Sequence, residues 1–140
     1  MKQVFITGFE PFGQRSVNRS WETAKHFIGK DSITVLRLPI SFADAHKILL
    51  SELESVDYGL IVMLGETSTT TDAVRLERVA LNMKDASVSD NDGVKPDEEC
   101  LIATAPTAYF TTFPVKSTAK ALNEKGHKVK VSRKSRRHWP

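Results

Sequence analysis

Three apolar segments alternate with two helix-forming segments in the first half of the chain, and this alternation restricts the possible folds most. The apolar segments are residues 4–6, residues 33–38 and residues 58–65, the last being an almost unbroken apolar run. Such a run is typical of a central parallel strand that is covered on both faces. The connecting segments are long enough for right-handed crossovers. We therefore predict an α/β fold of three layers, α/β/α, around a mostly parallel central sheet.

The helix signals lie between these strands and again near residue 115. The first helix is predicted from a cap at Ser20 to about Ile28, with Gly29 as its stop. The second begins at Ser41 or Asp44, and its apolar stripe is Ala45, Ile48, Leu49, Leu53 and Val56. Further on, the sequence predicts a strand-like segment over 74–83, an acidic loop over 85–97, a helix over 115–125 after Pro114, and a strand from Val129.

Length and composition describe an ordinary water-soluble chain. The 140 residues suit one domain, and 40% hydrophobic with 26% charged residues is a typical globular balance. No apolar run reaches the length of a membrane span, and the first residues do not resemble a signal peptide. The single cysteine, Cys100, excludes an internal disulfide and fits a reducing compartment. We expect a cytoplasmic protein that does not bind membranes.

The positive charge of the chain is concentrated at its end. Residues 133–140 contain four cations and no acid, so the formal net charge of +3 less these four leaves −1 for residues 1–132. A nearly neutral body does not indicate a nucleic-acid surface, and we expect no nucleic-acid partner. The basic run itself is either an unrelated, solvated tail or a genuine extension that binds phosphate groups or acidic surfaces.

The loop between the first strand and the first helix is the best candidate for a binding site. It reads Thr-Gly-Phe-Glu-Pro-Phe-Gly over residues 7–13, and open α/β folds bind ligands outside the carboxyl ends of their strands. The two glycines permit backbone conformations that other residues resist, and Pro11 fixes its own φ. Phe9 and Phe12 are then either the walls of a small apolar pocket or plugs that close the top of the core. The residues alone leave both interpretations open.

Several segments together resemble one family. Residues 2–13, 77–82, 85–93 and 108–114 are similar, in this order, to pyroglutamyl peptidases of type I, cytosolic cysteine peptidases that remove an amino-terminal pyroglutamate. The resemblance implies that Phe9 and Phe12 face the pyroglutamyl ring, that Asn18 is a hydrogen-bonding group of the pocket, and that Glu77 is the catalytic acid. It implies peptides with amino-terminal pyroglutamate as partners, and neither cofactor nor metal. Family members are homo-oligomers, an assembly that we do not extend to a shortened chain.

Glu77 has two possible roles. In a Cys-His-acid arrangement the carboxylate orients the imidazole, which activates the thiol because the thiolate is the nucleophile. The alternative is a surface ion pair with Arg75 or Arg78. The resemblance favours the catalytic role.

The chain departs from the family pattern at three places. Residues 66–71 read Glu-Thr-Ser-Thr-Thr-Thr where the family has a Gln, a glycine-rich turn and an Arg. Arg19 follows Asn18 where the family usually has proline. After Ser132, the family's Asn-x-x-Gly-x-x-x-Cys segment is replaced by residues 133–140. We expect the first departure to change the pocket and the third to remove the nucleophile.

The third departure governs the expected activity. Cys100 lies at no nucleophile position of the family and is expected to be a buried or half-exposed structural thiol; His127 is expected at the surface, and His138 belongs to the tail. We therefore expect residues 1–132 to be an incomplete peptidase-like domain without hydrolytic activity. A frameshift near codon 133 is one explanation of the tail, and such a product is expected to be marginally stable. The alternative function is a non-catalytic protein that binds pyroglutamate or peptides.

Overall fold

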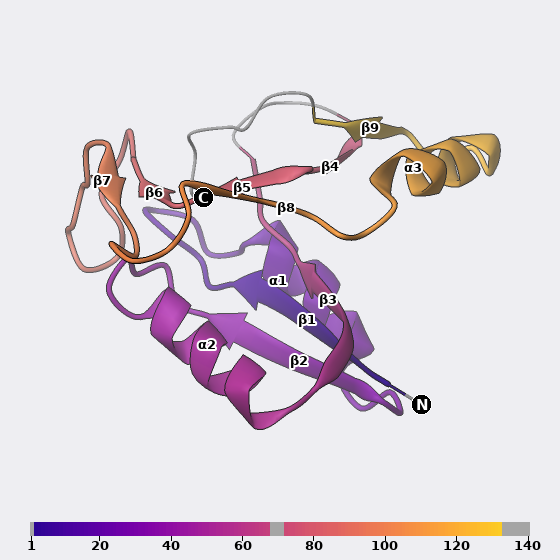
Figure 1. Cartoon of the computed structure of the whole chain (residues 1–140), viewed down its shortest axis with the longest axis horizontal. Coiled ribbons are helices and arrows are strands. Elements are labelled where there is room, and N and C mark those ends of the chain that lie inside the picture. Colours follow the sequence, from indigo (N-terminus) through magenta and orange to yellow (C-terminus); the bar gives the residue numbers. More distant parts are fainter. Residues whose placement is uncertain (1, 68–71, 133–140) are drawn as a thin grey trace. The chain divides into compact units, whose positions relative to one another are not determined.

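A computed structural model of the chain describes residues 2–67 and 72–132 (Figure 1). These residues form two compact units. Unit 1 contains the described residues up to 67 together with 88–95, and unit 2 contains 72–87 and 96–132. The basic tail predicted at 133–140, with His138, lies outside the described residues. Each unit has its own strand pairing.

Unit 1 is built on a parallel sheet of three strands in the order β2-β1-β3. Its elements, in chain order, are β1 (Gln3–Phe9), α1 (Arg19–Ala24), the 3-10 helix η1 (Lys25–Phe27), β2 (Ile33–Leu38), α2 (Ala45–Ser55) and β3 (Tyr58–Met63). The strand-helix-strand-helix-strand order predicted from the sequence is confirmed. β2 has the predicted bounds.

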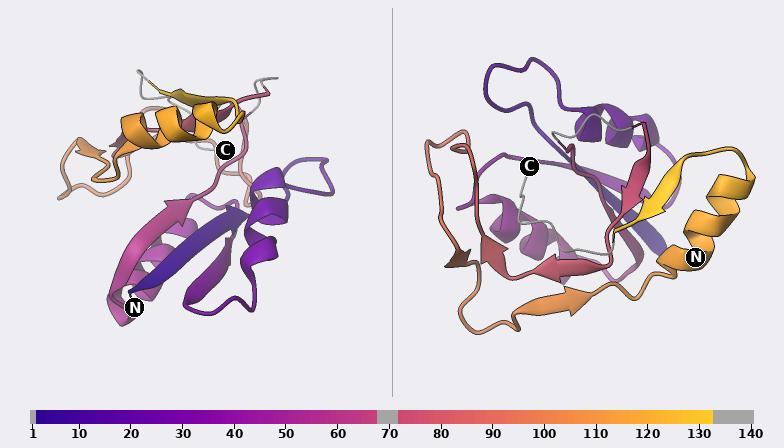
Figure 2. Two further views of the ribbon diagram at one scale, coloured as in Figure 1. Left: turned by 90° about the vertical axis from the view of Figure 1, so that its right-hand side faces the viewer. Right: turned by 90° about the horizontal axis from the view of Figure 1, so that it is seen from above.

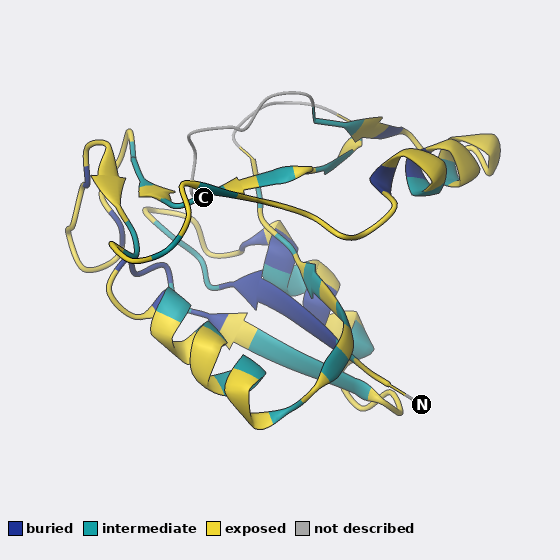
Figure 3. Ribbon diagram, in the orientation of Figure 1, coloured by how far each residue is buried: buried dark blue, intermediate teal, exposed yellow. Residues whose placement is uncertain are grey.

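The two α-helices of unit 1 lie on opposite faces of its sheet, as views at right angles show (Figures 1 and 2). This arrangement gives the predicted helix, sheet and helix layers. Because β1 is the central strand, its residues 5–9 are all buried (Figure 3). The other buried apolar residues of this unit come from α1, the end of β2 and the start of α2; they are Ala24, Leu38, Ile40, Phe42 and Ala45.

β3 lies at an edge of this sheet and not at its centre, so this part of the prediction is wrong. Phe5 of β1 pairs with Thr34 on one side and with Ile61 on the other. Side chains of β3 alternate between half-buried and exposed, and Ile61 and Met63 are 42% and 61% exposed. An apolar run indicates how much cover a strand needs, but not which segments supply it. Among the described residues, no strand pairs with the second edge of β3.

The first helix differs from its prediction at both ends. Its N-cap is Asn18 and not Ser20, because the Asn18 side chain accepts the Ser20 N–H. The α-helix ends at Ala24 and continues as the tighter turn η1, so Ile28 stays outside it and is exposed. Gly29 follows with a φ of 78°, the left-handed conformation expected of a helix stop. α2 has Asp44, one of the two predicted positions, as its N-cap.

β1 and α1 approach each other very closely at Gly8. A Cβ atom on this residue would lie 2.7 Å from the carbonyl oxygen of Ser20 and 2.8 Å from Cα of Trp21. These are backbone atoms that cannot rotate away, so the contact requires glycine. The next residue, Phe9, donates its backbone N–H to Ser20 Oγ at 2.9 Å. The end of β1 is thereby held against the first turn of α1.

Unit 2 consists of short strand pairs and one helix. Its elements are β4 (Val74–Leu76), β5 (Val79–Leu81), β6 (Met83–Lys84), β7 (Glu99–Cys100), β8 (Ala108–Phe110), α3 (Val115–Glu124) and β9 (Val129–Val131). β4 pairs with β9 in parallel, whereas β5 with β8 and β6 with β7 are antiparallel. The segment predicted as strand-like over 74–83 is therefore three short strands with three different partners.

The predicted helix and strand near the end of unit 2 are confirmed. α3 starts directly after Pro114, and Gly126, with a φ of 87°, follows its last turn. α3 contacts β9, and the buried apolar residues Val115, Ala119 and Val129 lie on these two elements. Asn123 joins them as well, since its side chain accepts the Val129 N–H at 3.1 Å and donates to the Val129 carbonyl at 2.9 Å.

Candidate functional site

The loop that follows β1 carries the predicted aromatic pair. Phe9 is the last residue of β1 and is buried, with 6% of its surface exposed. Phe12 is half-buried, and its carbonyl oxygen accepts the Arg15 N–H at 3.3 Å. Gly13, which directly follows Phe12, adopts a φ of 60°, which allows the chain to turn. Phe9 therefore packs into the core, while Phe12 retains a surface that a ligand can reach.

Asn18 closes this loop at the first turn of α1. It is 1% exposed, and its Oδ1 accepts the Ser20 N–H at 3.0 Å and the Ser20 hydroxyl at 2.7 Å. Its Nδ2 donates to the Glu10 carbonyl oxygen at 3.0 Å. These bonds tie both ends of the loop together. Asn18 thus holds the loop, and its oxygen is directed to the helix start.

A second segment holds the loop from a distant part of the sequence. Asn91 donates from Nδ2 to Glu10 Oε1 at 2.9 Å and to the Pro11 carbonyl oxygen at 3.0 Å. Glu10 Oε1 also accepts the Ile40 N–H at 3.0 Å. Glu10 and Asn91 are functional residues that the sequence-based prediction missed. Both belong to segments that carry the family resemblance, but no local pattern reveals that these segments meet.

Asp90 anchors the segment 88–95 to the start of α2. It is buried, its Oδ2 accepts the Phe42 N–H at 2.8 Å, and its Oδ1 accepts the Val94 and Asp92 N–H groups at 2.8 and 3.0 Å. Burial by itself raises the pKa of Asp90, but the hydrogen bonds from Phe42, Val94 and Asp92 outweigh burial and lower this pKa below its ordinary value. Asp90 is therefore a buried anion that backbone donors stabilise.

Four other acidic residues in and just after the acidic loop are exposed: Asp92, Asp97, Glu98 and Glu99. Glu99 forms an ion pair with Lys84 at 2.9 Å across the β6–β7 pair. These four residues are surface groups, in contrast to the buried Asp90.

Glu77 lies in unit 2, in the short connection between β4 and β5. It is exposed, and no ion pair joins it to Arg75 or Arg78, both of which the structure describes. The ion pair considered from the sequence is thus not formed. The next residue, Arg78, accepts the Thr111 N–H at its carbonyl oxygen at 2.9 Å, which fixes the backbone beside Glu77. Phe9, Phe12 and Asn18 all belong to unit 1.

Cys100, His127 and His46 differ in their exposure. Cys100 lies on β7 and is exposed, so the expectation of a buried or half-exposed thiol is wrong; its Sγ donates to the Ile102 carbonyl oxygen at 3.4 Å. His127 is exposed, as expected. His46, on α2, is half-buried, and within the described residues its buried Nδ1 has no hydrogen-bond partner.

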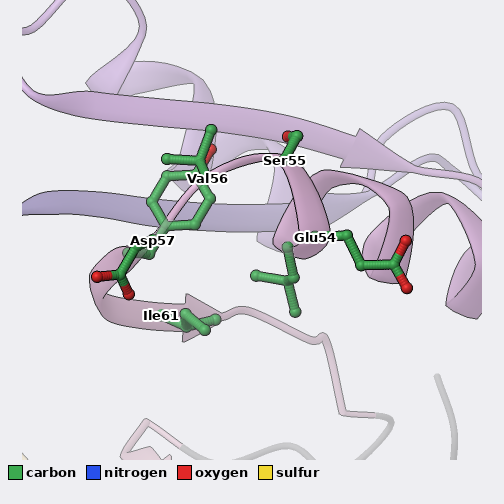
Figure 4. A pocket seen from close by; sticks show the side chains of 7 residues that line it. Glu54, Ser55, Val56, Asp57 and Ile61 are labelled. Carbon is green, nitrogen blue, oxygen red and sulfur yellow. The ribbon is translucent and has the colours of Figure 1, made fainter.

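Two surface hollows among the described residues lie away from the predicted site residues. One of about 340 Å³ lies between the end of α2 and the start of β3, where Glu54, Asp57 and Ile61 line it (Figure 4). Another, of about 480 Å³, lies at the start of α3 beside Arg78 and Phe110. Neither is lined by Phe9, Phe12, Asn18 or Glu77.

Two further properties concern residues 2–67 and 72–132. Within this part of the chain, no group of three or more His, Cys, Asp or Glu side chains is arranged to hold a metal ion. None of its helices combines the length and the apolar character that crossing a bilayer requires.

Comparison with known proteins gives a consistent result at the level of sequence. The family model for pyroglutamyl peptidase matches residues 2–137. Pyrrolidone-carboxylate peptidase 2 of Photorhabdus laumondii is 36% identical over 135 residues, which are 94% of this chain and 62% of that protein. Pyrrolidone-carboxylate peptidase of Bacillus mycoides is 36% identical over 136 residues, which are 94% of this chain and 63% of that protein. The chain thus spans less than two thirds of the length of these relatives.

Solved structures agree with the sequence comparison. The pyrrolidone carboxyl peptidase of Fervidobacterium islandicum matches 99% of this chain with a TM-score of 0.89 at 30% identity, and 68% of that structure is covered. That of Thermococcus litoralis matches 94% of this chain with a TM-score of 0.85 at 38% identity, and 61% of it is covered. Together with the family match over nearly every residue, these similarities show that the chain belongs to the pyroglutamyl peptidase family.

Proposed function

We propose that this chain binds the pyroglutamyl end of peptides at the loop between β1 and α1, in keeping with its family's reaction, the removal of amino-terminal pyroglutamate. The observation that carries this proposal is the way in which the loop is held. Asn18, the backbone N–H of Ile40 and Asn91 bond to Glu10 and Pro11 of the loop, and Phe12 beside them is half-buried. A loop fixed before the ligand arrives loses little conformational entropy on binding.

The proposed roles of the two phenylalanines differ. Pyroglutamate is a flat, uncharged lactam, so one face of its ring can pack against an aromatic side chain. Phe12 offers such a face, whereas Phe9 is buried and supports the loop from beneath. Asn18 acts by holding the loop, since its bonds go to Glu10 and Ser20. The specificity for pyroglutamate over proline then depends on groups that bond the lactam oxygen.

We further propose that Glu77 is the acid of the family's Cys-His-acid triad. Its carboxylate would orient an imidazole and stabilise the imidazolium that forms when the thiol gives up its proton. The thiolate then attacks the carbonyl carbon of the pyroglutamyl bond, and the imidazolium returns the proton to the leaving amine. The exposed position of Glu77, without an ion pair to either neighbouring arginine, is compatible with such a partner.

For residues 1–140 by themselves, we propose binding without hydrolysis. Their single cysteine, Cys100, lies on the two-residue strand β7 and matches no nucleophile of the family pattern. We also propose a cytoplasmic location, since one exposed thiol and no disulfide suit a reducing compartment.

The binding role can be tested with pyroglutamyl-alanine as the probe and prolyl-alanine as its competitor. We expect a chemical-shift titration of the full chain to show binding of the first peptide, weakened about tenfold by Phe12→Ala. Phe27→Ala is the matched control, because Phe27 is also half-buried and also lies beneath a cation, Lys30 at 5.2 Å. Equal binding of both peptides, or no effect of Phe12→Ala, would contradict the proposal.

Hydrolysis is tested separately by measuring release of free alanine from the same probe. We expect none from residues 1–140. If alanine is released and Cys100→Ser abolishes the release, then Cys100 is the nucleophile and the chain is a complete peptidase. If the probe binds and stays intact, the chain is a binding protein in this form.

A further inference from the structure

Glu66 lies where two segments of unit 1 leave the sheet side by side. β1 and β3 are parallel neighbours, and the Leu64 N–H donates to the Thr7 carbonyl oxygen at 3.0 Å just before Glu66. The segment after β3 and the loop after β1 therefore start from the same edge. The sequence marked both Glu66 and Arg19 as departures from the family pattern, and the structure shows that these two residues are in contact.

The Glu66 carboxylate binds two points of the loop after β1. Its side chain is 10% exposed, and Oε1 accepts from Arg15 Nη1 at 2.6 Å. Its Oε2 accepts the backbone N–H of Arg19 at 2.8 Å. An ionised acceptor makes a shorter and stronger hydrogen bond than a neutral one. One carboxylate thus fixes both the middle of the loop and the first residue of α1.

The contact extends from Arg15 to the proposed ligand surface. The Arg15 guanidinium lies over the Phe12 ring, with its carbon 5.6 Å from the ring centroid. A cation is attracted to the face of an aromatic ring, and a planar guanidinium also stacks on it. Glu66 therefore holds Arg15, and Arg15 covers one face of Phe12.

We propose that Glu66 is a positioning residue for the pyroglutamyl-binding loop, acting on Phe12 through Arg15 and on the start of α1 through the Arg19 N–H. This inference rests on the proposed function. It also accounts for the two departures together: proline at position 19 has no N–H, so the bond to Glu66 requires another residue there. Glu66 and Arg19 are in this sense a matched pair.

Four variants of the full chain test this role with pyroglutamyl-alanine as the probe. Glu66→Gln keeps an oxygen for the Arg19 N–H but removes the charge that holds Arg15, and Arg15→Ala removes its partner. We expect each to weaken binding about fivefold, and the double variant to bind no more weakly than either single one, because the two act through one contact. Glu54→Gln is the matched control, since Glu54 is an exposed glutamate on α2.

Position 19 provides an independent comparison. Proline is tolerated at the first residue of a helix, and Asn18 already has the extended backbone that a following proline requires, with φ of −123° and ψ of 121°. Arg19→Pro therefore removes the N–H without breaking α1, whereas Arg19→Ala retains it. We expect Arg19→Pro to weaken binding more than Arg19→Ala does.

A spectroscopic readout separates positioning from a general loss of structure. We expect the ring current of Phe12 to shift the protons of the Arg15 side chain above it upfield in the wild type. We expect this shift to collapse in Glu66→Gln and to persist in Glu54→Gln, while the dispersion of the core resonances stays unchanged in both. The positioning role would be overturned if Glu66→Gln bound the probe as tightly as the wild type, or if this variant kept the upfield shift of the Arg15 protons. Failure of the wild type to bind the probe would overturn the proposed function and, with it, this inference.

Discussion

The amide of Asn91 donates to the carboxylate of Glu10 at 2.9 Å, although 81 residues separate the two in the sequence. The same amide donates to the Pro11 carbonyl oxygen at 3.0 Å. A turn of the acidic loop is thereby fastened to the aromatic loop that follows β1. This single side chain links two of the segments on which the family resemblance rests.

Replacing Asn91 should therefore loosen the aromatic loop. Asn91→Ala removes both hydrogen bonds, and we expect it to lower the free energy of unfolding by about 1 kcal/mol and to weaken pyroglutamyl-alanine binding. Denaturant unfolding and a binding titration measure the two effects. Asp92→Ala is the control, because Asp92 is exposed. Its hydrogen bond to Asp90 comes from the backbone N–H, which the substitution retains. Equal behaviour of the two variants would show that the Asn91 bonds contribute nothing.

The buried anion Asp90 predicts a specific loss of stability in acid. Because hydrogen bonds hold the folded-state pKa of Asp90 below its ordinary value of about 3.8, the ionised form stabilises the fold above that pH. This contribution is lost as the pH falls through the lower, folded-state pKa. We expect the unfolding free energy of the wild type to decrease as the pH falls below about 4.

Asp90→Asn isolates this effect from other carboxylates. The amide of the variant accepts fewer hydrogen bonds from the Phe42, Asp92 and Val94 N–H groups than the carboxylate does. At neutral pH we therefore expect the variant to be less stable than the wild type by about 1 to 3 kcal/mol. The difference from the wild type should narrow as the pH falls below about 3.8, because the unfolded wild type then binds a proton at Asp90 more readily than the folded protein does. Chemical unfolding at pH 7 and at pH 3 gives the comparison. A constant difference at both values would assign the acid sensitivity to other groups.

The close contact at Gly8 predicts a large effect of one methyl group. Gly8→Ala places Cβ 2.7 Å from the Ser20 carbonyl oxygen, so β1 and α1 must separate, at a cost of about 1 to 3 kcal/mol. Gly65→Ala is a matched control, because nothing lies within 4 Å of a Cβ atom at Gly65. Thermal unfolding of both variants measures the difference. A Gly8→Ala protein as stable as Gly65→Ala would show that the helix moves freely at this point.

Asn18→Asp separates the two tasks of Asn18. The aspartate keeps an oxygen for the Ser20 N–H and so still caps α1, but it has no N–H for the Glu10 carbonyl oxygen. We expect the helix to be retained by circular dichroism while pyroglutamyl-alanine binding weakens. Loss of helix and of binding in parallel would instead indicate that Asn18 acts through the cap.

Local patterns were sufficient for much of the fold. The alternation of apolar runs with helical segments predicts the three strands of unit 1 and their order along the chain, and β2 has the predicted bounds. Gly29 and Gly126 mark helix ends through conformations that depend on their own residue type. Such features depend on neighbours within a few residues, so the sequence displays them directly.

The place of β3 and the role of Asn18 required more than local pattern. The apolar run of β3 predicted a central strand, but its position at the sheet edge depends on which other segments pair with it. Ser20 and Asn18 are both good helix caps by residue type, and the contact of Phe9 with Ser20 Oγ decides between them. Competing local choices of this kind are settled by tertiary contacts.

The sequence by itself determined the family, the α/β class and the loop that carries Phe9 and Phe12, because these depend on the order of residue types along the chain. The tertiary structure decided that Phe9 is core while Phe12 is accessible, and that Asn91, Asp90 and Glu66 hold their surroundings in place. Such contacts join residues 47 to 81 positions apart. They arise only when the parallel strands bring their carboxyl ends to one edge, and no pattern of neighbouring residues encodes that meeting.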